Sequence, residues 1–234
     1  MHLAQNEIRV LGALMEKEIT TPEYYPLSLN ALQAACNQRS SREPVLNLTE
    51  EEIRQALHAL EDRSLVNPTR DSRVPKYEHR ARTVLNLRRD ETAILCLLFL
   101  RGPQTPGELR SRADRLHTFD DLAAVNATLE RLANRPASSA PQAPETTGPL
   151  TVMLPRQPGA RESRYAHLLG GPVDSALPPS RDLYGVAASS SGPLAALQAE
   201  LAALRASLSA VEQRVALLER SSPSPLHSWT PAVE

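Results

Sequence analysis

The sequence predicts a mainly α-helical fold with small β-hairpins, of the α+β class: tandem winged helix-turn-helix domains followed by a C-terminal coiled-coil helix. Three observations lead to this prediction. A set of landmarks occurs twice, in the same order, within residues 1–169. A segment rich in proline, glycine and serine follows at 170–193. A heptad pattern of leucine and valine then occupies residues 194–218.

The repeated landmarks indicate an internal duplication. In both copies a glutamate is followed fourteen residues later by Thr-Pro, from Glu7 to Thr21 and from Glu91 to Thr105. A helix with one apolar face comes next, and each copy closes on a basic-Tyr-x-His sequence. The apolar face consists of Ile53, Leu57 and Leu60 in the first copy and of Val125, Leu129 and Leu132 in the second.

The first copy predicts a winged-helix domain over residues 1–89. Pro22 and Pro26 interrupt the chain after the first helix, because proline cannot continue it. Ser28 is a suitable N-cap for the second helix. Thr49 and Glu52 have the spacing of a capping box that begins the third. The predicted helices are 3–18, 28–37 and 49–63, and the predicted hairpin strands begin at 65–66 and return over 74–79.

The second copy predicts a winged-helix domain over residues 90–169. Gly102 and Pro103 end its first helix, and Thr105 with Glu108 forms a capping box around Pro106, which suits the first position of a helix. A loop of small residues and prolines at 136–149 is typical of a wing tip. The predicted helices are 90–101, 106–116 and 119–134, and the predicted strands are 150–154 and 161–168.

A tyrosine and a histidine recur at the end of each hairpin. Tyr77 with His79, and Tyr165 with His167, are spaced two residues apart on a predicted strand. Side chains at that spacing share one face of a strand. We therefore expect them to be structural and to anchor each hairpin to the helices of its own copy.

Residues 170–193 read as a linker, and residues 194–220 as a coiled coil, because the apolar positions alternate steps of three and four. In a parallel dimer Glu200 would face Arg205 of the other chain and Arg214 would face Glu219. Because leucine occupies both kinds of core position, the pattern does not distinguish a dimer from a trimer. The tail at 221–234 is expected to be disordered. The predicted interface residues are Leu194, Leu197, Leu201, Leu204, Leu208, Val211, Val215 and Leu218.

Composition excludes several classes of protein. The formal net charge of −1 excludes a polybasic binder. Cys36 and Cys96 have no zinc-ligand spacing, and no histidine pair has a metal-binding spacing, so we expect no metal and no cofactor. The N-terminus lacks the apolar core of a signal peptide. The apolar run 93–100 is too short to cross a bilayer. We expect a cytoplasmic protein with no membrane partner.

The basic residues are concentrated in one segment. Residues 70–89 contain seven basic and two acidic side chains, a local charge of +5. This segment is the predicted first wing, so its cations could bind DNA phosphates. The alternative is a solvated edge strand protected by charge. The candidate phosphate-binding residues are Arg70, Arg73, Lys76, Arg80 and Arg82.

The third helix of the first copy holds the candidate base-reading residues. With the apolar face inward, Arg54, Gln55 and His58 point outward, and arginine and glutamine are natural partners of guanine and adenine. The helix begins with three glutamates at 50–52, however, which repel phosphates. The third helix of the second copy begins with two aspartates at 120–121 and offers few donors. We expect the first copy to contact DNA if either does.

Several motifs resemble the YceH-like family over about residues 3–169. The resemblance implies two tandem winged helices, often with a helical C-terminal extension, and supplies no catalytic residue. Together with the basic segment, it leads us to expect a non-enzymatic protein that binds duplex DNA as a transcriptional regulator or nucleoid-associated adaptor. The alternative is a winged-helix scaffold for protein partners. The matching stretches include EIRVL at 7–11, TTPEYYPLSLN at 20–30, CNQ at 36–38, LRGPQT at 100–105 and GELR at 107–110.

Overall fold

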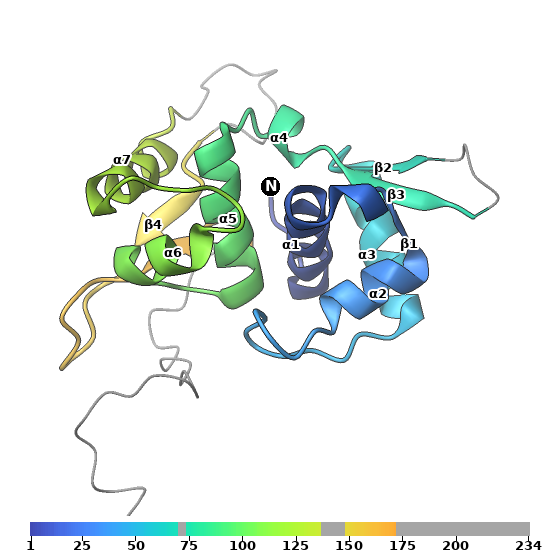
Figure 1. Cartoon of the computed structure of the whole chain (residues 1–234), viewed down its shortest axis with the longest axis horizontal. Helices are drawn as coiled ribbons and strands as arrows, with labels where there is room; N and C mark the ends of the chain where they lie inside the picture. Colours follow the sequence, from blue (N-terminus) through green and yellow to red (C-terminus); the bar gives the residue numbers. More distant parts are fainter. Residues whose placement is uncertain (70–73, 137–147, 172–234) are drawn as a thin grey trace, which may run out of the picture. The chain divides into compact units, whose positions relative to one another are not determined.

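The computed structural model of the chain describes residues 1–69, 74–136 and 148–171 (Figure 1). The predicted coiled coil, its interface residues, the tail and almost all of the linker lie outside these ranges, as do residues 137–147. The prediction of a wing tip at 136–149 is wrong, because these residues precede both strands of the second hairpin, Thr151–Met153 and Tyr165–His167, which are joined by residues 154–164. Within the part that the structure describes, no helix is both long and apolar enough to span a membrane. The architecture is mixed: helices with two small antiparallel sheets.

The first repeat has the winged-helix arrangement. Its three-stranded sheet has the order β1-β3-β2, with both neighbouring pairs antiparallel. The long hairpin matches the predicted one, whereas the two-residue strand β1 is not visible in the sequence pattern. The elements are α1 (Gln5–Thr20), the 3-10 turn η1 (Pro22–Tyr24), β1 (Leu27–Ser28), α2 (Leu29–Cys36), α3 (Glu50–Asp62), β2 (Val66–Thr69) and β3 (Lys76–His79).

The second repeat has the same order of helices and hairpin. The place of β1 is taken by a single antiparallel bridge between Gln104 and Tyr165. A short helix, α4 (Ala81–Val84), joins the two repeats and is not predicted by the sequence. The other elements are α5 (Arg89–Arg101), α6 (Pro106–Ala113), α7 (Leu122–Ala133), β4 (Thr151–Met153) and β5 (Tyr165–His167).

Local side-chain caps determine where the helices begin. The Thr49 hydroxyl accepts a hydrogen bond from the N–H of Glu52 (3.3 Å), and the Glu52 carboxylate accepts one from the N–H of Thr49 (2.8 Å). This is the predicted capping box. In α7 the Asp121 carboxylate accepts from the N–H of Ala124 (2.8 Å). The helix therefore begins at Leu122, three residues later than predicted, because Asp121 is its cap.

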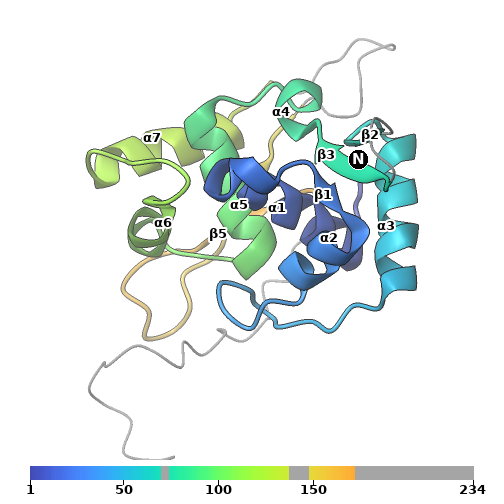
Figure 2. The same ribbon diagram turned by 45° about the vertical axis from the view of Figure 1, so that its right-hand side comes forward.

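The two repeats share one hydrophobic core. Helices α1 and α5 lie side by side in both Figure 1 and Figure 2, and the buried residues of both repeats form one continuous cluster. Every residue of the apolar run 93–100 is buried, which confirms a buried helix. The two helices are tightly packed at Gly12, where an added β-carbon would lie 3.0 Å from the side chains of both Phe99 and Leu100.

Each hairpin histidine contacts the first helix of its own repeat. His79 Nε2 lies 2.9 Å from Glu18 Oε2 in α1, and the backbone N–H of His79 donates to the Tyr25 hydroxyl (2.6 Å). The hydrogen bond from His79 lowers the pKa of Glu18. In the second repeat the ring of His167 packs edge-on against Phe99 of α5, with ring centroids 5.0 Å apart. The predicted anchoring role of these two histidines is confirmed.

Candidate nucleic-acid interface

The outer face of α3 presents the three predicted base-reading residues. Arg54, Gln55 and His58 are all exposed, as the apolar periodicity of the helix requires. Two of them already have acidic or polar partners on the same helix. Arg54 forms an ion pair with Glu50, and Gln55 Nε2 donates to Glu51 Oε1 (3.1 Å). An approaching base would have to displace these contacts.

The N-terminal turn of α3 has a strongly negative charge. Glu50, Glu51 and Glu52 favour the positive end of the helix dipole and so stabilise the helix. The same carboxylates repel a phosphate backbone. This end of the helix, which in helix-turn-helix proteins approaches the bases, is therefore a poor site for tight sequence reading.

The predicted wing residues fall into two groups. Arg70 and Arg73 lie outside the described residues. Lys76 begins β3, where it lies between Ser28 of β1 and Thr69 of β2 in the sheet register, and its side chain is half-buried. Arg80 and Arg82 are exposed at the start of α4.

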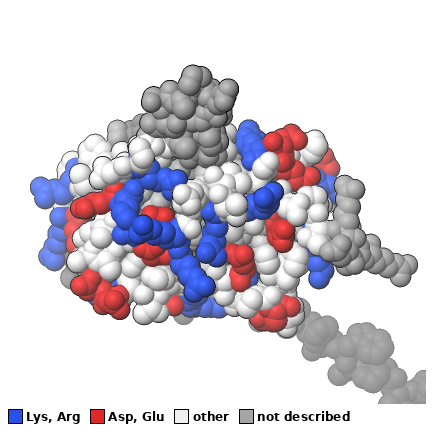
Figure 3. Space-filling model, turned by 90° about the horizontal axis from the view of Figure 1, so that it is seen from above, with Lys and Arg blue, Asp and Glu red and all other residues white. Residues whose placement is uncertain are grey.

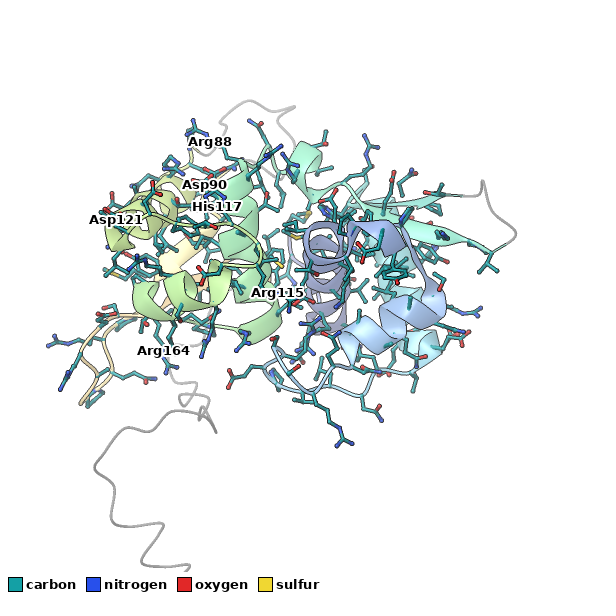
Figure 4. All side chains as sticks on the ribbon, viewed as in Figure 1. Arg88, Asp90, Arg115, His117, Asp121 and Arg164 are labelled. Atoms are coloured by element: carbon teal, nitrogen blue, oxygen red, sulfur yellow. The ribbon has the colours of Figure 1, made fainter. Side chains whose placement is uncertain are left out.

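The structure adds Arg88 and Arg89 to this basic surface. Both are exposed at the N-terminal end of α5, directly after α4. Figure 1 shows α4 and this end of α5 on the upper side of the molecule, and Figure 4 shows Arg88 there. We call Arg80, Arg82, Arg88 and Arg89 the α4 arginine cluster. Their spacing within the +5 segment is a signal that the sequence offers. The unpredicted helix α4 carries Arg80 as its N-cap and Arg82 within it, and Arg88 and Arg89 begin the next helix, α5.

The α4 arginine cluster forms no close ion pair within the described ranges, although Arg82 is near enough to Glu18 to lower the pKa of that carboxyl group. Among described residues, no ion pair joins any of its four guanidinium groups to a carboxylate. Figure 3, which views the molecule from this side, shows basic side chains gathered across the middle of the face with acidic ones between them. The cluster can therefore receive an anion without breaking an existing ion pair.

In the second repeat, polar side chains of the third helix, α7, form contacts with α5 of the same repeat. Arg131 of α7 pairs with Asp90 and with Glu91 of α5, and the Thr128 hydroxyl donates to Asp90 (2.9 Å). Burial opposes ionisation of Asp90, but the hydrogen bond from Thr128 and the neighbouring Arg131 hold its pKa below the usual value. Two of the few donors on this helix thus fasten α7 to α5, so we locate the candidate interface on the first repeat and the junction.

Comparisons with known proteins give the family. A family model described as "Protein of unknown function, DUF480" matches residues 3–160. The chain belongs to this family. Within it, a UPF0502 protein of Koribacter versatilis is 50% identical over 194 residues, covering 82% of this chain and 85% of the relative. A UPF0502 protein of Aeromonas hydrophila is 47% identical over 220 residues, covering 91% and 96%.

Membership of the DUF480 family extends over both repeats of the chain. A UPF0502 protein of Vibrio cholerae is similar over a shorter span, at 50% identity over 182 residues, which covers 75% of this chain and 80% of the relative. The names of these relatives state no activity. The function of this DUF480 protein therefore has to be inferred from its surface and its cavities.

Proposed function

We propose that this DUF480 protein is a non-enzymatic winged-helix protein that binds duplex DNA, as a transcriptional regulator or nucleoid-associated adaptor. The observation that supports this proposal most directly is the α4 arginine cluster. Its four arginines are exposed and form no ion pair among the described residues, and they belong to α4 and the start of α5, which follow the hairpin of the first winged-helix domain in the chain. The resemblance to the YceH-like family, which implies tandem winged helices, points the same way.

The proposed contact is mainly with phosphates. An arginine that neutralises a DNA phosphate releases condensed counterions, which favours binding without regard to sequence. Base readout would contribute less, because Arg54 and Gln55 are held by Glu50 and Glu51 on α3. Phosphate contacts position a protein on the duplex and carry no sequence information. We therefore expect weak sequence preference and strong salt dependence.

Self-association through residues 194–218 is part of the same proposal. A parallel coiled-coil dimer would present two α4 arginine clusters to one duplex. Linking two binding surfaces raises the effective concentration of the second contact. A modest affinity of each chain for DNA would then suffice for stable binding by the dimer.

The experiment compares two double variants of the full chain in fluorescence anisotropy with a labelled duplex of mixed sequence. Arg80→Gln with Arg82→Gln removes two charges of the α4 arginine cluster. The matched control, Arg156→Gln with Arg161→Gln, removes two exposed charges from the loop of the second hairpin. We expect the first variant to bind at least tenfold more weakly and the control to bind within about twofold of wild type, each lost contact being worth about 1 kcal/mol or more. Equal affinities would contradict the proposal.

A second candidate function is a scaffold for protein partners without direct DNA contact. The observation that favours it is the acidic start of α3, where a recognition helix would meet phosphate. Affinity capture of the full chain from lysate, with and without nuclease, distinguishes the two. Partners that vanish after nuclease treatment support DNA binding, whereas partners that persist, with no binding of duplex at low salt, support the scaffold.

A further inference from the structure

A cavity of about 520 Å³ lies where the two repeats meet. Its wall is formed by the start of the chain and of α1, by Glu43 and Pro44 between α2 and α3, by the end of α5, and by the loop and second strand of the second hairpin. Pockets for small molecules commonly have volumes of about 300–1,000 Å³ and form at junctions between domains. The volume and the position are therefore those of a small-molecule site.

Arg9 is the most unusual residue of the cavity wall. The residue is 3% exposed, and the terminal nitrogens of its side chain donate to the backbone carbonyls of Cys36 (3.1 Å) and Pro44 (2.6 Å). No ion pair with a described carboxylate is present, and Nε is buried without a partner. Desolvation and the nearby Arg42 both lower the pKa of Arg9. A buried cation without a counter-charge is costly, and an anionic ligand would supply that charge.

His167 is the second residue of the wall with an unsatisfied polar atom. Its Nδ1 is buried and has no hydrogen-bond partner. Burial lowers the pKa of His167 to about 4, so the ring is neutral near pH 7. A neutral imidazole nitrogen can donate to, or accept from, an oxygen of a ligand. Within the described ranges, Arg9 Nε and His167 Nδ1 are the two buried side-chain atoms left without a partner, and both residues line this one cavity.

The remaining wall determines which anion would fit. Ile8, Leu98 and Phe99 supply apolar surface. Arg101 and Arg164 add positive charge, whereas Glu43 and Glu162 add negative charge. The two carboxylates make a dianion such as phosphate unfavourable, and the apolar surface favours a ligand with a hydrocarbon body. The combination suits a monoanion with a ring or branched chain.

We propose that this cavity binds a small monocarboxylic acid with an aromatic or branched aliphatic body. The carboxylate would accept a hydrogen bond from Arg9 Nε and contact His167, and the hydrocarbon body would lie against Leu98 and Phe99. Because α1 belongs to the first repeat and α5 to the second, the ligand would contact both. The proposal does not depend on DNA binding.

The test titrates the full chain with benzoate, phenylacetate and isovalerate, followed by NMR of arginine side chains labelled with ¹⁵N. We expect at least one acid to shift the Arg9 Nε signal saturably, with a dissociation constant of about 1 mM, which is typical of fragments of this size. Benzylamine, which has the same ring and the opposite charge, should cause no shift. The proposal is overturned if none of the three acids shifts the signal by 20 mM, or if benzylamine shifts it equally.

Two variants check that the signal comes from the cavity. Arg9→Met removes the charge, but its burial could prevent folding. Ala160→Trp is therefore the main variant, because Ala160 lines the cavity and is itself exposed, so that a large side chain can block the opening without disturbing the core. We expect Ala160→Trp to weaken acid binding at least tenfold with no change in melting temperature. Unchanged binding in Ala160→Trp would contradict the proposed location.

Discussion

A β-carbon added to Gly12 of α1 would lie 3.0 Å from Cδ2 of Leu100 in α5. It would lie equally close to the β-carbon of Phe99, which cannot move without its backbone. Helices α1 and α5 therefore touch at a point that has no room for a side chain. This contact joins the cores of the two repeats, and glycine at position 12 is what permits it.

Replacing Gly12 with alanine should therefore destabilise the protein. Alanine gains about 1 kcal/mol of helix propensity over glycine, but overpacking a close core contact costs about 1–3 kcal/mol. We expect the free energy of unfolding in urea to fall by about 1 kcal/mol. The matched control is Gly107→Ala in α6, where the added β-carbon meets nothing closer than 3.9 Å and stability should stay equal or rise. A rise in both variants would refute the close contact.

The buried ion pair between Glu16 and Arg42 should contribute more to stability than an exposed one. Arg42 has a fully buried guanidinium that donates to both carboxylate oxygens of Glu16, at 3.1 and 2.5 Å. Glu16→Gln leaves that charge buried without a counter-charge, although the guanidinium keeps its hydrogen bonds to the carbonyls of Ala35 and Ser41, and should cost about 3–5 kcal/mol. The exposed pair between Glu50 and Arg54 is the control, and Glu50→Gln should cost no more than about 1 kcal/mol. Similar losses in the two variants, measured by urea unfolding, would contradict this difference.

His167 should make stability depend on pH. Its folded pKa is about 4, below the ordinary value of 6.5, so between these values the unfolded chain binds more protons. The stability that neutral His167 contributes is thus complete above pH 6.5 and is lost as the pH falls toward 4, by about 3 kcal/mol in all. His167→Phe keeps an aromatic ring against Phe99 and should flatten this slope. If melting temperatures of the variant and wild type fall in parallel over that range, His167 is not the cause.

Dimer formation is expected to depend on residues 194–218, which lie beyond the described residues. Deleting residues 186–234 should give a monomer in multi-angle light scattering, because the apolar heptad seam supplies the association energy. Deleting only residues 221–234 leaves the seam intact and should leave the dimer unchanged. A dimer that survives the longer deletion would show that association occurs elsewhere.

Local features of the fold could be predicted from the sequence. Capping boxes act within four residues, so Thr49 with Glu52 and Thr105 with Glu108 placed two helix starts correctly. The apolar periodicity of α3 also identified its outward residues, Arg54, Gln55 and His58, since a helix has a fixed period. These predictions succeeded because the interactions involved join residues that are close together in the sequence.

Features that depend on distant contacts could not be predicted. The apolar period of α1 marks a buried face, but it does not say that α5 covers it. For the same reason the burial of Arg9 against the carbonyls of Cys36 and Pro44 was not foreseen. The short helix α4 follows a strand and has no apolar period of its own, so the helical turn that carries Arg80 and Arg82 between the hairpin and α5 was not predicted.

The proposal that the α4 arginine cluster binds DNA phosphates is tested most directly by the salt dependence of duplex binding. The logarithm of the binding constant should fall linearly with the logarithm of salt concentration, by about 0.9 for each phosphate neutralised. Replacing Arg80, Arg82, Arg88 and Arg89 together with glutamine should lower the magnitude of that slope by about 3 or more per protein chain. Equal slopes for this variant and wild type, or no binding of duplex by wild type at low salt, would contradict the proposal.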